Sequence, residues 1–313
     1  MTQSFELASE IEEVSEKKPT FLAIGVFDGV HLGHQKMLGS MASAAHAEGA
    51  RAAALTFYPH PITVIQGRRD RLYLCTLSER VELLADQDLD LVVTQTFDEN
   101  LRRTSATDFI NQLCQHLNLK QLWGGSFSLG YNREGDLPFL RRIGREKGFT
   151  VHKFEGMVKW NGRQVSSSRV RQSLRNGEVH KVSGLLGRPY RLTGTVIPGD
   201  GRGKQLGIPT ANLRVWEEQL LPATGVYAAN AWLGDNWFAA ASNIGYRPTV
   251  DGHGLTVEAH LLDFDAEIYG EEITLEFIKR IRDEKKFTGL EALVSQIKAD
   301  IKAVRELLKP KEV

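Results

Sequence analysis

Two histidines spaced three residues apart, His31 and His34, lie directly after a glycine-rich turn. Residues 21–34 read FLAIGVFDGVHLGH, so an apolar strand is followed by the turn and by the start of a helical pattern. Backbone N–H groups in the first turn of a helix bind anions, and side chains three residues apart share one helix face. These imidazoles and amides therefore suit the phosphates of a nucleoside triphosphate.

The glycines of this turn let the backbone approach phosphate oxygens without interference from a Cβ atom. An ordinary strand–helix turn with two surface histidines is the alternative, but the preceding strand and the attached GxFDG favour a nucleotide site. The candidate nucleotide-binding residues here are Gly25, Phe27, Asp28, Gly29 and Gly33.

A second candidate phosphate site lies further along the chain, in the sequence VSSSRVR. Ser167 or Ser168 is expected to cap a helix, with Arg171 one turn into it. Hydroxyls, free amides and a guanidinium suit the distal phosphates of a nucleotide, although alone this pattern is typical of an ordinary helix start. The segment FYPHP contributes Pro59 and His60, either as the wall of a pocket for a ring or as a rigid turn.

A glycine-rich loop and a PTAN segment lie together in residues 194–212, GTVIPGDGRGKQLGIPTAN. The spacing is not that of a Walker loop, and a simple hairpin is the alternative. Thr210 and Asn212 offer hydroxyl and amide oxygens on one strand face, which suit Mg²⁺. The candidate nucleotide-binding residues of the loop are Gly199, Gly201, Arg202, Gly203 and Lys204.

Glu258 lies in a strand-like stretch, 255–261, in which apolar residues alternate with others. Its neighbours 257 and 259 are expected to face a core, so the carboxylate points away from it, either into solvent or into a cleft. Arg282, Glu284 and Phe287 precede the last helix and form either a charged helix start or a clamp for a planar ring.

The elements that must position these residues change character along the chain. Up to about residue 182, strand-like and helical stretches alternate, which predicts a parallel sheet covered by helices, with ligands beyond the carboxyl ends of the strands. After residue 187, period-two strands predict a small antiparallel barrel closed by a helix over 290–308, with a boundary at 184–189. In the first half we expect strands at 21–24, 52–57, 89–94, 121–123 and 149–154, and helices at 35–48, 78–86 and 106–116.

Composition sets wider limits on the function. A length of 313 residues favours two domains, and 39 basic against 39 acidic residues give no global field for nucleic acid or anionic membranes. Cys75 and Cys114 are too few for a disulfide framework or a zinc site. Residues 1–19 hold no apolar signal region, and no apolar stretch is long enough to span a bilayer. We expect a soluble cytoplasmic protein without nucleic-acid or membrane partners, of undetermined oligomeric state.

The motifs of the first half, GVFDGVHLGH, FYPHP and SSSRVR, resemble the HxGH nucleotidyltransferases and, more narrowly, the adenylyltransferase half of bacterial FAD synthetases. The resemblance implies a Rossmann-like domain over residues 1–185 that transfers AMP from ATP to FMN. It also implies that His31 and His34 hold the triphosphate and offset charge on the α-phosphoryl group, and that Ser167 and Arg171 contact phosphates on the leaving side. FMN contacts would come from Pro59, His60, Arg133 and Asp136.

The motifs of the second half, GTVIPGDGRGKQLGIPTANL, SNIGYRPTV, VEAHLLDFDAEIYG and IRDEKKF, resemble the riboflavin kinase module of the same synthetases. The resemblance implies a six-stranded antiparallel barrel over residues 186–313, with a terminal helix, that phosphorylates riboflavin with ATP. It also implies Mg²⁺ ligation by Thr210 and Asn212, Glu258 as base for the riboflavin 5′-hydroxyl, and nucleotide contacts from the glycine loop. Flavin contacts would come from Arg282, Glu284 and Phe287.

One segment departs from the pattern of that family. Residues 124–130 read GGSFSLG, where the family shows an acidic residue and a second aromatic, so Ser126 and Leu129 stand in their places. Arg133, Gly135 and Asp136 are kept. A riboflavin kinase with a weak or inactive adenylyltransferase half is therefore one alternative, and a flavin- or nucleotide-binding regulator without turnover is another. Chemistry on tRNA lacks support, because no basic stripe is visible.

Ser126→Asp tests this departure. Serine accepts a hydrogen bond but brings no negative charge, so we expect the restored carboxylate to raise the rate of FMN adenylylation or the affinity for FMN. The measurement is FAD formation against FMN concentration. An unchanged rate and affinity would show that Ser126 does not weaken this half.

Overall fold

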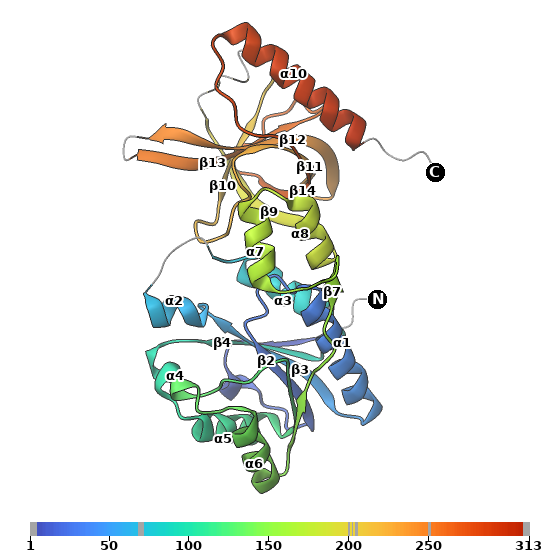
Figure 1. Cartoon of the computed structure of the whole chain (residues 1–313), viewed down its shortest axis with the longest axis vertical. Helices are drawn as coiled ribbons and strands as arrows, with labels where there is room; N and C mark the ends of the chain where they lie inside the picture. Colours follow the sequence, from blue (N-terminus) through green and yellow to red (C-terminus); the bar gives the residue numbers. More distant parts are fainter. Residues whose placement is uncertain are drawn as a thin grey trace. The chain divides into compact units, whose positions relative to one another are not determined.

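The computed structural model describes residues 5–67, 72–199, 201, 203, 206–249 and 252–308. The chain divides into two compact units, each described here by itself (Figure 1). The first comprises Met1–Asp70 and Thr76–Val165, and the second comprises Arg71–Cys75 and Ser166–Val313. The candidate residues Arg202 and Lys204 lie outside the described part of the chain. No helix within that part has the length and hydropathy needed to cross a membrane.

The first unit contains the predicted parallel sheet, with six strands in the order β1-β4-β3-β2-β5-β6. All five expected strands are present, so this part of the fold prediction is confirmed. The three-residue strand β1 was not predicted, because so short a stretch shows no periodicity. The strands are β1 (Glu6–Ala8), β2 (Thr20–Gly25), β3 (Arg51–Tyr58), β4 (Leu91–Thr96), β5 (Leu119–Gly124) and β6 (Thr150–Lys153).

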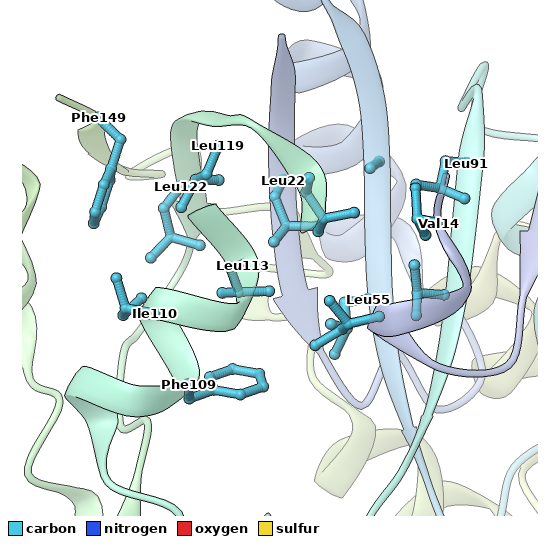
Figure 2. Packing of buried hydrophobic residues seen from close by; sticks show 14 of the residues in the cluster. Val14, Leu22, Leu55, Leu91, Phe109, Ile110, Leu113, Leu119, Leu122 and Phe149 are labelled. Carbon is cyan, nitrogen blue, oxygen red and sulfur yellow. The ribbon is translucent and has the colours of Figure 1, made fainter. Parts of the chain in front are cut away.

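Two hydrophobic clusters cover the two faces of this sheet, because successive side chains of a strand point to opposite faces. On one face Leu22 belongs to a cluster with Leu113 of α5 (Figure 2). On the other face Phe21 and Ala23 belong to a cluster with Leu38 of α1. The helices are α1 (Leu32–Ala47), α2 (Pro61–Gln66), α3 (Leu77–Ala85), α4 (Glu99–Arg103), α5 (Ala106–Leu117) and α6 (Leu137–Lys147), with 3₁₀ turns η1 (Ile11–Glu13) and η2 (Tyr131–Arg133) and a hairpin β7 (Lys159–Trp160) and β8 (Arg163–Gln164).

The strand order reverses between β2 and β5. From β2 the chain proceeds through β3 to β4 on one side, whereas β5 and β6 follow on the other side of β2. In open α/β sheets, ligands bind beyond the carboxyl ends of the strands at such a point of reversal. The two segments that begin there are the turn at residues 26–31, after β2, and the segment 125–130, after β5.

The second unit contains a closed antiparallel barrel with the strand order β10-β13-β12-β11-β14-β9. This confirms the predicted six-stranded barrel. Helices α7 (Ser167–Arg175) and α8 (Val179–Leu186) also belong to this unit, and α8 packs on β9 and β14. The functional boundary at 185/186 remains a proposal. The strands are β9 (Tyr190–Ile197), β10 (Ala211–Val215), β11 (Gly225–Leu233), β12 (Asn236–Thr249), β13 (Gly252–Leu261) and β14 (Glu272–Arg282).

The terminal helix α10 (Leu290–Leu307) is attached to the barrel by charged pairs and by apolar contacts. The Nε of Arg282 lies 3.0 Å from each carboxylate oxygen of Asp300, and Nη2 donates to Oδ2 over 2.8 Å. Asp300 is buried, and Val304 on the same helix packs with Ala228 and Leu262. Arg282, predicted to contact flavin, thus also binds the last helix.

Asp300→Ala is expected to lower the free energy of unfolding by about 3 kcal/mol, because it leaves the largely buried guanidinium of Arg282 without its partner. Denaturant unfolding followed by circular dichroism measures this change. The control is Asp263→Ala, which removes the exposed partner of Arg305 on the same helix and should change stability little. Equal effects of the two substitutions would contradict this account.

Candidate functional site

The histidine pair of the first unit lies at the start of α1, directly after β2. His31 is the N-cap, and its Nδ1 accepts a hydrogen bond from the backbone N–H of His34 over 3.3 Å. The two rings are stacked, with centroids 3.7 Å apart and an interplanar angle of 14°. The HxGH spacing therefore does two things at once: it caps the helix and brings both imidazoles to the anion-binding end of its dipole.

Left-handed backbone shapes the turn that leads to this pair. Phe27 has φ 49°, Gly29 has φ 76° and Val30 has φ 35°, values that are unusual for phenylalanine and more so for a β-branched valine. The ring of Phe27 is buried and meets the ring of His34 edge-on, with centroids 5.2 Å apart. Strain of this kind persists only where the surroundings hold the backbone in place.

Two glycines of the motif make room for rings of the protein itself. A Cβ on Gly25 would lie 3.0 Å from the ring of Phe27, and one on Gly33 would lie 3.1 Å from Cε1 of His31. Both distances are tighter than ordinary van der Waals contact. These glycines therefore position Phe27 and His31, a role that the sequence analysis did not foresee.

Burial lowers the pKa of His34 well below its usual value, and the nearby His31 and Arg80 lower it further. The Nδ1 atom of His34 is buried and makes no hydrogen bond with the described residues. His34 is thus a neutral imidazole near pH 7 in the protein alone. Asp28, a candidate nucleotide contact, is buried, and its Oδ1 lies 4.0 Å from Nη2 of Arg80.

The remaining candidates of the first unit lie at helix starts and in the segments next to them. Pro59 follows a cis peptide bond at the end of β3, and Nδ1 of His60 accepts from the N–H of Ile62 at the start of α2 over 3.1 Å. Asp136 caps α6 by accepting from the N–H of Phe139 over 2.9 Å, and Arg133 is exposed with φ 61°. Their flavin contacts remain predictions.

The segment 125–130 leads to a loop that is docked on α5. Glu134 Oε1 accepts from the backbone N–H of Ala106 over 2.6 Å, and a Cβ on Gly130 would lie 2.3 Å from that nitrogen. Ser126 is exposed at the start of the segment. It follows the carboxyl end of β5 by two residues and so lies beside the point where the strand order reverses.

Helix α7 begins one residue earlier than expected. Its N-cap is Ser166, whose Oγ accepts from the N–H of Arg169 over 3.3 Å, so the prediction that Ser167 or Ser168 caps the helix is wrong. A run of three serines offers three possible caps, and Ser166 is the one with extended backbone. Ser167 and Ser168 lie in the first turn of the helix instead.

Arg171 contacts the short segment Arg71–Cys75, which belongs to the second unit. Its Nε donates to the backbone oxygen of Leu72 over 2.9 Å. That segment is held in turn by the N–H of Leu72, which donates to Glu218 O over 2.9 Å, and by a bridge between Tyr73 and Gln219. Helix α7 belongs to the second unit. That Ser167, Ser168 and Arg171 form one site with the histidine pair therefore remains a prediction.

Strand register builds the candidate site of the barrel. Glu258 on β13 pairs with Asn212 on β10 and with Asn243 on β12, so the three residues form a row across three strands. Val257 and Ala259 are buried, which confirms that the side chain of Glu258 is on the opposite side from the core. Asn243 was not among the predicted residues; its signal was the SNIG motif.

The glycine loop packs directly on the predicted metal ligands. A Cβ on Gly199 would lie 2.1 Å from Nδ2 of Asn212, and one on Gly203 would lie 2.4 Å from Ile208 O and 3.3 Å from Oγ1 of Thr210. Only glycine lets the backbone approach this closely. The structure thus brings Gly199, Gly203, Thr210 and Asn212 together, whereas a Cβ on Gly201 would meet nothing within 4 Å.

Glu284 reaches the same row of residues. A Cβ on Gly245 would lie 2.8 Å from Oε1 of Glu284 and 3.1 Å from Nδ2 of Asn243, so both side chains converge over this glycine. The ring of Phe287 lies 5.8 Å from Cζ of Arg282. Glu284 therefore lies beside the candidate kinase site, whereas Arg282 and Phe287 contact each other.

The donors available for a metal are oxygens of neutral side chains. Within the residues that the structure describes, no three His, Cys, Asp or Glu side chains gather into a possible metal site. Thr210 Oγ1 and the Asn212 amide, under a close-packed glycine loop, are hard ligands that fit a Mg²⁺ ion brought with phosphate oxygens.

Comparison with known families assigns each half to its own family. The model of the FAD synthetase family matches residues 13–169, and that of the riboflavin kinase family matches residues 186–308. The fold is similar to a solved structure described as a macrolide-efflux protein from Streptococcus pneumoniae, with a TM-score of 0.87 and 26% identity over 96% of this chain and 98% of that chain.

Curated relatives match the chain along most of its length. The bifunctional riboflavin kinase/FMN adenylyltransferases of Bacillus subtilis (strain 168) and Escherichia coli (strain K12) are each 35% identical to it. Both alignments cover 91% of this chain and 91% of the relative. The chain therefore belongs to the family of bifunctional riboflavin kinase/FMN adenylyltransferases.

Proposed function

We propose that this chain carries out two successive ATP-dependent reactions, the phosphorylation of riboflavin to FMN and the transfer of AMP from ATP to FMN, which yields FAD and pyrophosphate. One observation carries the proposal: two chemically different sites, a stacked histidine pair at a helix start and a glutamate flanked by two asparagines, lie in the halves that match the two families.

The kinase reaction belongs to the barrel. The 5′-hydroxyl oxygen of riboflavin attacks the γ-phosphorus of ATP, the bond to the β-phosphate oxygen breaks, and ADP leaves. Glu258 accepts the hydroxyl proton, and its neighbours Asn212 and Asn243 hold the row in which it lies. Thr210 and Asn212 would bind Mg²⁺, which when present offsets charge on the phosphates. Glu284 and Phe287, with Arg282, would contact the flavin.

Glu258→Ala is expected to lower the rate of riboflavin phosphorylation by about 10²–10⁴, the usual contribution of a positioned general base. FMN adenylylation should be retained, since Glu258 lies in the other unit. The measurement is separation of flavin products over time with riboflavin or FMN as substrate. The control is Glu272→Ala, an exposed glutamate of the same barrel, which should phosphorylate riboflavin at the normal rate.

The adenylylation reaction needs no nucleophile from the protein, because a phosphate oxygen of FMN attacks the α-phosphorus and pyrophosphate leaves. Catalysis then depends on positioning and on stabilisation of charge. His31 and His34, at the N-terminus of α1, would bind the triphosphate, and Ser167, Ser168 and Arg171 would contact the phosphates of the leaving group. A neutral His34 keeps one ring N–H, with which it would donate a hydrogen bond to a phosphate oxygen.

His34→Ala is expected to stop FAD formation and to let FMN accumulate when riboflavin and ATP are supplied, because the barrel continues to make FMN. Product analysis over time measures both flavins. The control is His46→Ala, a histidine on the same helix that pairs with Asp88 and Asp90, and it should still yield FAD. Loss of both reactions in a folded His34→Ala or Glu258→Ala protein would refute two separate sites.

A further inference from the structure

We propose that Arg80, which lies outside the motifs discussed above, is a positioning residue for FMN adenylylation. Its buried guanidinium holds the strained turn after β2 and, through that turn, the ring of His34. The inference rests on the adenylyltransferase function proposed for the first unit.

Arg80 enters the interior from the first turns of α3. The helix start is secured by a capping box, in which the N–H of Glu79 donates to Thr76 Oγ1 over 3.2 Å and the N–H of Thr76 donates to Glu79 Oε2 over 2.8 Å. The side chain of Arg80 is 0% exposed. Arginine is almost never buried so completely without partners, since removing its charge from water is costly.

The partners of Arg80 lie at the end of β3. Its Nη1 donates to the backbone oxygen of Phe57 over 3.0 Å and to Oγ1 of Thr56 over 3.2 Å. The hydroxyl of Thr56 in turn donates to the backbone oxygen of Val26 over 2.8 Å. Arg80 is therefore linked through one hydroxyl to the first residue of the turn.

A second link reaches the turn on the other side of Phe27. Nη2 of Arg80 lies 4.0 Å from Oδ1 of Asp28, which is itself 2% exposed. The guanidinium thus contacts, directly or through Thr56, both neighbours of Phe27, the residue with φ 49°. The ring of Phe27 meets the ring of His34, so a displacement of this turn would be transmitted to the histidine pair.

Arg80 influences His34 through its positive charge as well as through its contacts with the turn. The charged groups that influence this imidazole are His31 and the guanidinium of Arg80, which itself lies 4.0 Å from the carboxylate of Asp28. Burial is the main cause of the lowered pKa of His34, and the positive charge of Arg80 disfavours the imidazolium further. Removing the charge of Arg80 should therefore raise the pKa of His34 towards the usual value, whereas a neutral change elsewhere in the unit should not.

Two substitutions separate position from charge. Arg80→Met removes the hydrogen bonds and the charge, whereas Arg80→Lys keeps the charge but lacks the planar guanidinium that reaches both sides of Phe27. Because small displacements of reacting groups are costly, we expect the kcat of adenylylation to fall about 10–100-fold in Arg80→Met and by less in Arg80→Lys. The control is Arg103→Met, an exposed arginine of the same unit, with kcat unchanged.

The measurements use the full-length chain. FAD formation from FMN and Mg-ATP gives kcat and KM, riboflavin phosphorylation by the same preparation serves as an internal control, and NMR titration gives the pKa of His34. We expect the pKa of His34 to rise in Arg80→Met and to stay near the wild-type value in Arg80→Lys, with riboflavin phosphorylation retained in both.

A wild-type kcat for adenylylation in Arg80→Met would overturn the inference, as would an unchanged pKa of His34 in that variant. Should Arg80→Met not fold, Arg80→Lys decides: a reduced kcat supports the inference and a wild-type kcat refutes it. A wild-type chain that forms no FAD at all would instead refute the proposed function. Failure of the inference about Arg80 and failure of the proposed function are therefore distinguishable.

Discussion

Backbone pairing between strands β10, β13 and β12 brings Asn212, Glu258 and Asn243 into one row, although they lie far apart in the chain. The same constraint operates in the first unit, where β2 pairs with both β3 and β5 and so creates the point of reversal next to His31. In each unit the chemistry therefore depends on main-chain hydrogen bonds between distant segments. A slip of one residue in the barrel would turn Glu258 towards the core.

The two proposed phosphate sites differ in the groups that they offer. In the first unit, the proposed phosphate site consists of a helix start and two stacked imidazoles, of which His34 has a lowered pKa because it is buried. In the barrel, neutral oxygens of Thr210 and Asn212 lie under a close-packed glycine loop beside the carboxylate of Glu258.

Local patterns were sufficient to predict five strands of the parallel sheet, the barrel and helices α1, α3, α5 and α10, but not the long-range contacts of single residues. The periods of 3.6 and 2 residues identified helices such as α1 and α5 and the barrel, and short apolar stretches identified the parallel strands, which are buried on both faces. The partner of Arg282 and the place of Glu284 beside Asn243 depend on residues distant in sequence. The same holds for Arg80, whose helix was predicted but whose burial was not, since a charged residue on an amphipathic helix normally faces solvent.

The path of the chain has a consequence for how such a protein can be cut or recombined. The backbone passes from one unit to the other after Asp70, returns after Cys75 and passes again after Val165. Because Leu72 and Tyr73 are bonded to Glu218 and Gln219, no single break separates two intact halves. An exchange of modules between homologous genes at residue 165 would combine this short insertion with a foreign barrel. The foreign barrel would therefore have to offer the same backbone pairing at the position of residues 218–220.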